Sequence, residues 1–238
     1  MSTVITVATP APPDTRTDTR TVRRYAAAAL LPLGPLSVAI LRGVLPYFHA
    51  GDSRQTIEQT AGNLGRQDAV LWLSLVAILT LVPSAVAAGR LAQRHAPVLS
   101  LLGVGLLMSG YLSLPFAAGD PTIRTLAGGL VDHGTAARLL DQLNGLAPVG
   151  IAEVIFIVGH ILGTVLLGAA LWRAHAVPTW AAIAIIVSQP LHLVSFVVLG
   201  NQPLDVCAWG LTALGLGVAA ARVLRTPNDS WDLPPVAR

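Results

Sequence analysis

The stretch VGIAEVIFIVGHILGTVLLGAALW, residues 149–172, indicates the fold class of this chain. It contains one carboxylate (Glu153) and one histidine (His160), and its other residues are apolar or small. A helix rises about 1.5 Å per residue, so about 20 apolar residues cross the ~30 Å hydrocarbon core of a bilayer. The stretch therefore predicts a transmembrane helix.

Comparable apolar runs occur at 24–46, 68–89, 97–117, 178–200 and 203–223. The composition agrees with them, because 53% of the 238 residues are hydrophobic, only 11% are charged, and the mean hydropathy is +0.66. A soluble domain carries about 25% charged residues. We therefore predict an all-α fold, an integral membrane bundle of six transmembrane helices with the lipid bilayer as its partner. Nucleic acid is not an expected partner, since the arginines are spread along loops and ends.

Three regions follow from this pattern. Residues 1–23, rich in Thr, Pro, Arg and Asp, have little to bury and predict a disordered cytoplasmic tail. Residues 24–225 form the predicted transmembrane domain, and residues 226–238 form a cytoplasmic C-terminal tail. The single cysteine, Cys207, excludes an intrachain disulfide and a site built from several cysteines.

The placement of arginines predicts the orientation in the membrane. Short links after the second and fourth spans force antiparallel neighbours, so successive links alternate between the two sides. Ten arginines fall on the side of the two termini: Arg16, Arg20, Arg23, Arg24, Arg90, Arg94, Arg173, Arg222, Arg225 and Arg238. Four fall on the other side: Arg54, Arg66, Arg124 and Arg138. Because basic residues concentrate on the cytoplasmic side, both termini are predicted to be cytoplasmic.

Two longer loops on the outer side carry helical patterns. In residues 53–66, Thr56 and Gln59 have the spacing of a capping box, and in residues 134–145 Thr135 is the predicted N-cap. Apolar residues recur at helical spacing in both loops. We predict two short amphipathic helices that lie at the outer interface or over the mouth of the bundle.

Ionisable residues inside a membrane are costly and mark candidate functional sites. His160 in the fourth span and His192 in the fifth lie at nearly equal distances from the link between these spans. Antiparallel helices of equal rise place them at nearly the same depth. At about 100° per residue, each histidine belongs to a narrow stripe of polar and small residues. The other polar members of the two stripes are Glu153, Thr164, Ser188 and Ser195.

Nearer the outer side, Arg42 and Asp205 join Glu153 as charged groups close to the ends of spans. The leading hypothesis is an outward-facing polar pocket between spans four and five, which binds a small ligand or relays protons, since histidine titrates near neutrality. His160 and His192 would lie at its base, and the three charged residues at its mouth. The sequence has no HExxH motif and no phosphate-binding glycine loop, so we assign no catalytic residue, no metal site and no cofactor.

Other interpretations of the same histidines stay open. Both can be neutral, hydrogen-bonded residues that specify how helices pack. Two imidazoles from facing helices can also ligate a b-type haem, which would make the chain a redox membrane protein. A third alternative is a structural or regulatory partner of another membrane protein. Separately, Gly159 and Gly163 allow close helix approach and indicate a candidate homo-oligomer contact.

The run GHILGTVLLGAALWRAHAVPTWAAIAIIVSQPLHLV (159–194), followed by PLDVCAWGL (203–211), resembles a known family. It is similar to the uncharacterised bacterial six-span integral membrane proteins grouped as domain of unknown function 4386. The shared features are a span that ends in ALWR (170–173), a short link, and a next span that opens with Pro178 and Trp180. The resemblance implies six spans and a bacterial inner (plasma) membrane, and it implies no catalytic residue.

Overall fold

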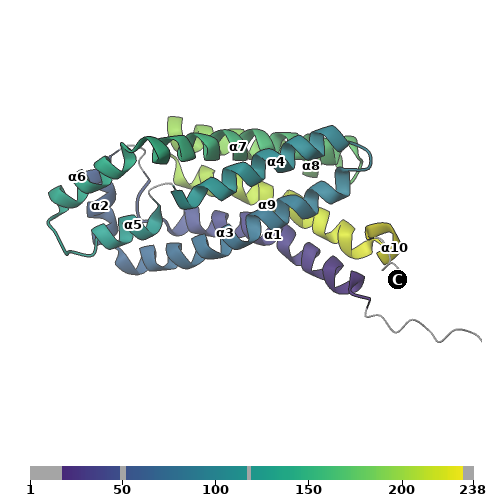
Figure 1. Ribbon diagram of the computed structural model, residues 1–238, viewed down its shortest axis with the longest axis horizontal. Coiled ribbons are helices and arrows are strands. Elements are labelled where there is room, and N and C mark those ends of the chain that lie inside the picture. The colour runs from purple at the N-terminus through teal and green to yellow at the C-terminus, as the bar shows by residue number, and fades with distance from the viewer. Residues whose placement is uncertain (1–17, 49–51, 117–118, 233–238) are drawn as a thin grey trace, which may run out of the picture.

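Six long apolar helices dominate the computed structural model (Figure 1), which describes residues 18–48, 52–116 and 119–232. They are α1 (Arg20–Val44), α3 (Leu64–Ala92), α4 (Pro97–Ser113), α7 (Ala147–Arg173), α8 (Thr179–Leu193) and α9 (Gln202–Arg225). Each belongs to a segment that is long and apolar enough to cross a membrane. Within the described residues there is no strand, so the predicted all-α fold with six spans is confirmed.

The bundle pairs helices that are distant in sequence as well as neighbours. Helix α7 lies along α4, α1 contacts both α3 and α9, and α8 contacts both α7 and α9. Because lipid is as apolar as a protein interior, such pairs depend on close packing and buried hydrogen bonds. One of these bonds joins α3 to α1, where Ser84 Oγ donates to the Leu31 carbonyl at 2.6 Å. Another joins α4 to α3, where Ser100 Oγ donates to the Gly89 carbonyl at 2.9 Å.

Glycines bring α4 and α7 into close contact. A Cβ added to Gly159 would lie 2.6 Å from the Leu106 carbonyl oxygen, and one added to Gly103 would lie 2.8 Å from the Leu167 backbone nitrogen. Gly163 meets α4 in the same way. The face of α7 that carries Gly159 and Gly163 is therefore covered by α4 of the same chain. The structure gives no support to the predicted homo-oligomer contact through these two glycines.

Three short helices cover one end of the bundle: α2 (Ser53–Ala61), α5 (Asp120–Leu126) and α6 (His133–Asn144). Figure 1 shows them grouped at the end opposite the C-terminus, and we call this end the cap end. They share a small hydrophobic core of their own, made by Ile57, Ile123, Ala127, Ala136 and Leu140. Helices α2 and α6 occupy the loops where short helices were predicted, and α5 is an addition.

The N-caps of two of these helices differ from the prediction. Asp52, not Thr56, caps α2, because its carboxylate accepts a hydrogen bond from the Gln55 backbone N–H at 2.9 Å. Asp132 caps α6 and accepts from the Thr135 backbone N–H at 3.0 Å. Asp and Thr are both favoured N-caps, so spacing alone did not select between them. The hydroxyl and the backbone N–H of Thr135 lower the pKa of Asp132, which keeps this cap ionised.

A short helix, α10 (Asn228–Trp231), packs against the opposite end of the bundle. Trp231 is buried there, and the Arg90 guanidinium of α3 lies 5.9 Å from the centroid of its ring. Asp229 of α10 pairs with Arg20, where α1 begins. We call this end the α10 end.

Parts of both predicted tails thus contribute to the fold. Helix α1 begins at Arg20, ahead of the predicted span start at residue 24, and α10 lies within the predicted C-terminal tail. Residues 1–17 and 233–238, which make up the rest of these tails, lie outside the described residues.

Helix α8 changes form after Pro190. Proline has no N–H to donate, so the helical hydrogen-bond ladder loses a bond at this point. The chain passes from α8 into a π-helical turn, Val194–Val198. Turns of this kind occur frequently at functional sites. This one begins two residues after His192 and precedes α9, which carries Asp205.

Candidate functional site

Three ionisable side chains meet inside the bundle near the cap end. Asp205, in the first turn of α9, is fully buried, and its two carboxylate oxygens bind different partners. His192 Nδ1 of α8 contacts Oδ1, and Arg42 Nε of α1 donates to Oδ2. An ionised carboxylate only accepts hydrogen bonds, so the form of His192 that bonds to an ionised Asp205 has its proton on Nδ1. We call these three residues the charged cluster, and all three were predicted as site residues.

Aromatic rings surround the charged cluster. The Arg42 guanidinium lies 4.5 Å from the ring centroid of Phe196 and 5.1 Å from that of Phe48. The ring centroids of His192 and Trp209 are 5.5 Å apart. Cation–π attraction of this kind offsets part of the cost of removing a guanidinium from water. The rings of Phe48 and Phe196 therefore stabilise the buried position of Arg42, in addition to its ion pair with Asp205.

His160 lies beside the charged cluster without bonding to it. It is 2% exposed, and its ring centroid is 5.6 Å from that of His192. Its ring stacks on Phe156 at 4.2 Å, and its Nδ1 lies 2.6 Å from the Phe156 carbonyl oxygen. Its Nε2 is buried and has no hydrogen-bond partner in the part of the chain that the structure describes. The structure thus brings together the two histidines that were predicted to share one depth.

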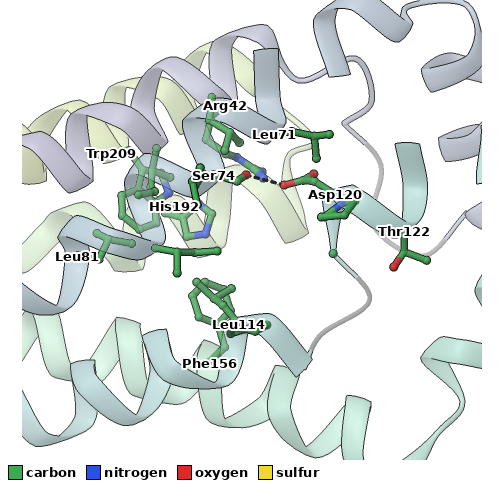
Figure 2. Close-up of a pocket in the computed structure, with 18 residues that line it drawn as sticks. Arg42, Leu71, Ser74, Leu81, Leu114, Asp120, Thr122, Phe156, His192 and Trp209 are labelled. Atoms are coloured by element: carbon green, nitrogen blue, oxygen red, sulfur yellow. Dashed lines mark hydrogen bonds between the residues drawn. The ribbon is translucent and has the colours of Figure 1, made fainter. Parts of the chain in front are cut away.

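A cavity of about 600 Å³ lies next to the charged cluster. Figure 2 shows its polar and aromatic wall residues in order from one end to the other: Trp209 and His192, then Arg42 and Ser74, then Asp120 and Thr122. The remaining wall is mainly aliphatic side chains of α1 and α3, with Phe156 of α7. Small-molecule sites typically have volumes of roughly 300–1,000 Å³ and combine apolar walls with a few polar groups.

The cavity does not lie between α7 and α8, where the pocket was predicted. Those two helices pack directly, because Gly168 lets them approach, and a Cβ there would lie 2.7 Å from Ile186 Cγ1. The cavity instead lies between α1, α3, the turn after α4 and the start of α5. Helices α7, α8 and α9 each contribute one wall residue, namely Phe156, His192 and Trp209.

Asp120 forms the polar group at the far end of the cavity. Its carboxylate accepts hydrogen bonds from Ser74 Oγ at 2.8 Å, the Tyr47 hydroxyl at 3.2 Å and Gln67 Nε2 at 3.3 Å. Burial and the neighbouring carboxylate raise the pKa of Tyr47 well above its ordinary value, so its hydroxyl stays a donor. All three partners are uncharged, and no described cation lies within ion-pair distance of Asp120.

A short polar chain lies between α8 and α9, and it begins at Gln189, three residues before His192 in α8. Gln189 Nε2 donates to Thr212 Oγ1 at 3.0 Å, and Thr212 donates to Ser188 Oγ at 2.7 Å. These three side chains are buried. The next buried side chains between α8 and α9 toward the α10 end include Ile185 and Leu216, which are apolar. The polar chain therefore ends inside the bundle.

The other predicted site residues lie apart from the cavity wall. Thr164 Oγ1 donates to the His160 carbonyl of its own helix at 2.7 Å, and Ser195 Oγ donates to the Leu191 carbonyl at 2.6 Å. Glu153 is exposed on α7. It shares a heptad position with His160, yet its side chain is exposed whereas that of His160 is buried.

Sequence reasoning missed three polar residues of this region: Asp120, Gln189 and Trp209. Gln189 is a polar side chain within an apolar span, so a scan for such residues finds it. Trp209 lies in a span where an aromatic residue ordinarily indicates packing. Asp120 follows a predicted span and precedes a proline, a pattern typical of a loop, and no local pattern indicates that its side chain reaches the cavity.

The fold and its apolar surface define the class of this chain, which is a multi-pass integral membrane protein with six candidate transmembrane helices. No protein-family model, curated protein or solved structure matches it. The resemblance to the family of domain of unknown function 4386 therefore stays a prediction.

Proposed function

We propose that this protein binds a small ligand in the membrane-embedded cavity beside His192. The observation that carries the proposal is the charged cluster in the cavity wall, where Arg42 and His192 both line the space and share the buried Asp205. Moving a charged group from water into the protein interior costs several kcal/mol. Attraction between the paired charges offsets this cost only when their geometry and hydrogen bonding are good. Ionisable residues inside a membrane are by default functional candidates. A cluster that served packing alone would not need an open space beside it.

The polar chain favours a binding site over a proton relay across the membrane. A relay needs titratable or hydroxyl groups in succession from one side to the other. The chain from Gln189 through Thr212 stops at Ser188, and apolar side chains follow. Among the described residues, these hydrogen-bonded side chains therefore form no continuous polar path from the charged cluster to the α10 end.

Filling the cavity tests the proposal while the ligand is still unidentified. Ala77 of α3 is 4% exposed and lines the cavity, so Ala77→Phe places a ring in the space. Leu79→Phe is the matched control, because Leu79 is 64% exposed and lies two residues away. Protein purified in mild detergent is extracted with organic solvent, and the released compounds are quantified per chain by mass spectrometry. We expect one compound in wild type and Leu79→Phe, and roughly 10-fold less of it in Ala77→Phe.

A histidine variant completes this experiment. His192→Ala is expected to lose the compound while the folded yield stays near that of wild type, because Asp205 keeps Arg42 as a partner. His95→Ala is its control, since His95 is exposed in the link between α3 and α4. A large loss of folded protein with His192→Ala would indicate a packing role. Equal amounts of compound in wild type and Ala77→Phe would contradict the proposal.

A second candidate is a redox protein with a b-type haem between His160 and His192. Hydrogen bonding supports it, because Nδ1 of each ring is bonded to protein, as in imidazoles that ligate metals through Nε2. The packing of Trp209 opposes it, since its ring lies 6.1 Å from His160 and 5.5 Å from His192. His160 also does not line the cavity. The same solvent extract tests this candidate, because non-covalent haem would be released into it and detected by its visible absorption. An extract without haem absorption would contradict the haem-binding function.

Our proposal for the location is a bacterial inner membrane with both termini in the cytoplasm. The six candidate spans put both ends on one side, and the arginine distribution supports the cytoplasmic side. Alkaline phosphatase fused to Arg238 would then be inactive in a bacterial host, and an active fusion would contradict this orientation.

A further inference from the structure

The carboxylate of Asp120 has no counter-ion within the described part of the chain, although it belongs to the cavity wall and is half-buried. Arginines of the cap end have other partners. Arg124 pairs with Asp68, and Arg66 donates to two backbone carbonyls at the end of α1. The N-terminus of the short helix α5 supplies only a partial positive charge. Because charges removed from water are ordinarily paired, a positive group in the cavity would be stabilised here.

The hydrogen bonds of Asp120 leave room for one more donor. A carboxylate has about four lone-pair sites on its two oxygens. Oδ1 accepts from the Tyr47 hydroxyl and Gln67 Nε2, whereas Oδ2 accepts from Ser74 Oγ. Ser74 is also a half-buried wall residue, and Figure 2 shows its bond to Asp120 in the cavity wall. Oδ2 can therefore accept one further hydrogen bond from a group in the cavity.

Charge selects a cation over an anion or a neutral head group. Asp205 already compensates Arg42 in the charged cluster. His192 adds a positive charge only when both of its ring nitrogens are protonated. An anionic head group would be repelled by Asp120, in surroundings that screen charges weakly. A neutral head group would leave the charge of Asp120 uncompensated. A protonated amine supplies both a positive charge and an N–H donor.

The rest of the wall suits an apolar body. The part of the wall that α3 contributes runs from Leu71 to Leu81, about 15 Å at 1.5 Å per residue. Most wall residues of α1 and α3 are Leu, Ile, Val or Ala. We propose that the cavity binds a protonated amine with an apolar body, whose ammonium group donates to Asp120 and whose hydrocarbon part lies along α3 toward Trp209. This inference rests on the proposed function, because it names the ligand class for the same cavity.

Four probes with the same ten-carbon tail and different head groups test this inference. They are decylamine (protonated at neutral pH), decyltrimethylammonium (a cation without N–H), decanol (neutral) and decanoate (an anion). Each is titrated at neutral pH against the purified protein in detergent, and the unfolding midpoint is followed, since a ligand that binds only the folded state raises it. We expect decylamine to give a saturable rise at the lowest concentration and decyltrimethylammonium to need more. We expect no saturable rise with decanol or decanoate, and none with any probe in Ala77→Phe.

A charge variant locates the contact. Asp120→Asn keeps the size of the side chain and an acceptor oxygen but removes the charge, so half-saturation is expected at a roughly 10-fold higher decylamine concentration. Asp141→Asn is the matched control, because Asp141 is exposed on α6 at the same end of the bundle and does not line the cavity. Unchanged half-saturation in Asp120→Asn would overturn the assigned counter-ion. Saturable binding that survives in Ala77→Phe would overturn the assigned place.

The outcomes separate this inference from the proposed function. A saturable rise with decanol or decanoate that matches decylamine and disappears in Ala77→Phe would overturn the amine class and leave the cavity as a ligand site. Equal half-saturation with decylamine and decyltrimethylammonium would overturn the assigned N–H bond to Oδ2. No rise with any of the four probes would overturn the amine class, and if the solvent extract also held no compound, the proposed function would fail with it.

Discussion

Replacement of Asp205 by asparagine is expected to lower the free energy of unfolding by roughly 3–5 kcal/mol, the typical cost of breaking a buried ion pair. The carboxylate is fully buried and binds both Arg42 and His192. Without its charge, the Arg42 guanidinium stays inside the bundle with no counter-ion, and His192 loses its ionised acceptor. The change is measured as the folded yield and as the denaturant midpoint of the protein in mild detergent.

A double variant separates the loss of one partner from the loss of the pair. Arg42→Met combined with Asp205→Leu is expected to recover most of the stability, because apolar side chains can replace a buried ion pair at little cost. Asp229→Asn serves as the control, since the Asp229 side chain is 84% exposed in its pair with Arg20 and surface ion pairs contribute little. Wild-type stability in Asp205→Asn would contradict the view that this carboxylate compensates Arg42.

Gly159→Ala is expected to destabilise the bundle by about 1–3 kcal/mol, although it adds a single methyl group. The new Cβ would lie 2.6 Å from the Leu106 carbonyl oxygen and 2.9 Å from Gly110 Cα. Both contacts are with backbone, which cannot rotate aside, so α4 and α7 must move apart. The unfolding midpoint in detergent measures the effect.

Gly105→Ala is the control for this substitution, because it lies on α4 and an added Cβ meets nothing within 4 Å. It is expected to leave the unfolding midpoint unchanged or slightly higher, since alanine favours a helix over glycine. Cross-linking of both variants tests the homo-oligomer prediction at the same time. A smaller dimer fraction in Gly159→Ala with unchanged stability would show that Gly159 faces a second copy, contrary to the packing on α4.

Much of the architecture was predictable because a membrane leaves few choices. In hydrocarbon, each backbone polar group must be satisfied within its own segment, so an apolar run of about 20 residues forms a helix. The shared depth of His160 and His192 was predictable for a similar reason, since helical rise is constant. Their ring centroids lie 5.6 Å apart in the structure. The helical spacing of apolar residues predicted the two loop helices. It did not predict their N-cap residues, because Asp and Thr are both favoured at the N-cap.

The position of the cavity was not predictable, because lipid and protein interiors are equally apolar and the hydrophobic pattern leaves helix rotation undetermined. Glu153 and His160 share a heptad position, yet one is exposed and the other buried. Asp120 reaches the cavity only because α5 folds back over α3, where Ser74 binds its carboxylate.

The amino-acid pattern was enough to establish the all-α class, the six spans and the ionisable residues that are costly inside a membrane. Helix packing in three dimensions set which of those residues meet and where the space beside them lies. The difference arises because a buried charge is compensated by contact in space and not by nearness in sequence. The partners of Asp205 lie 13 residues away at His192 and 163 residues away at Arg42.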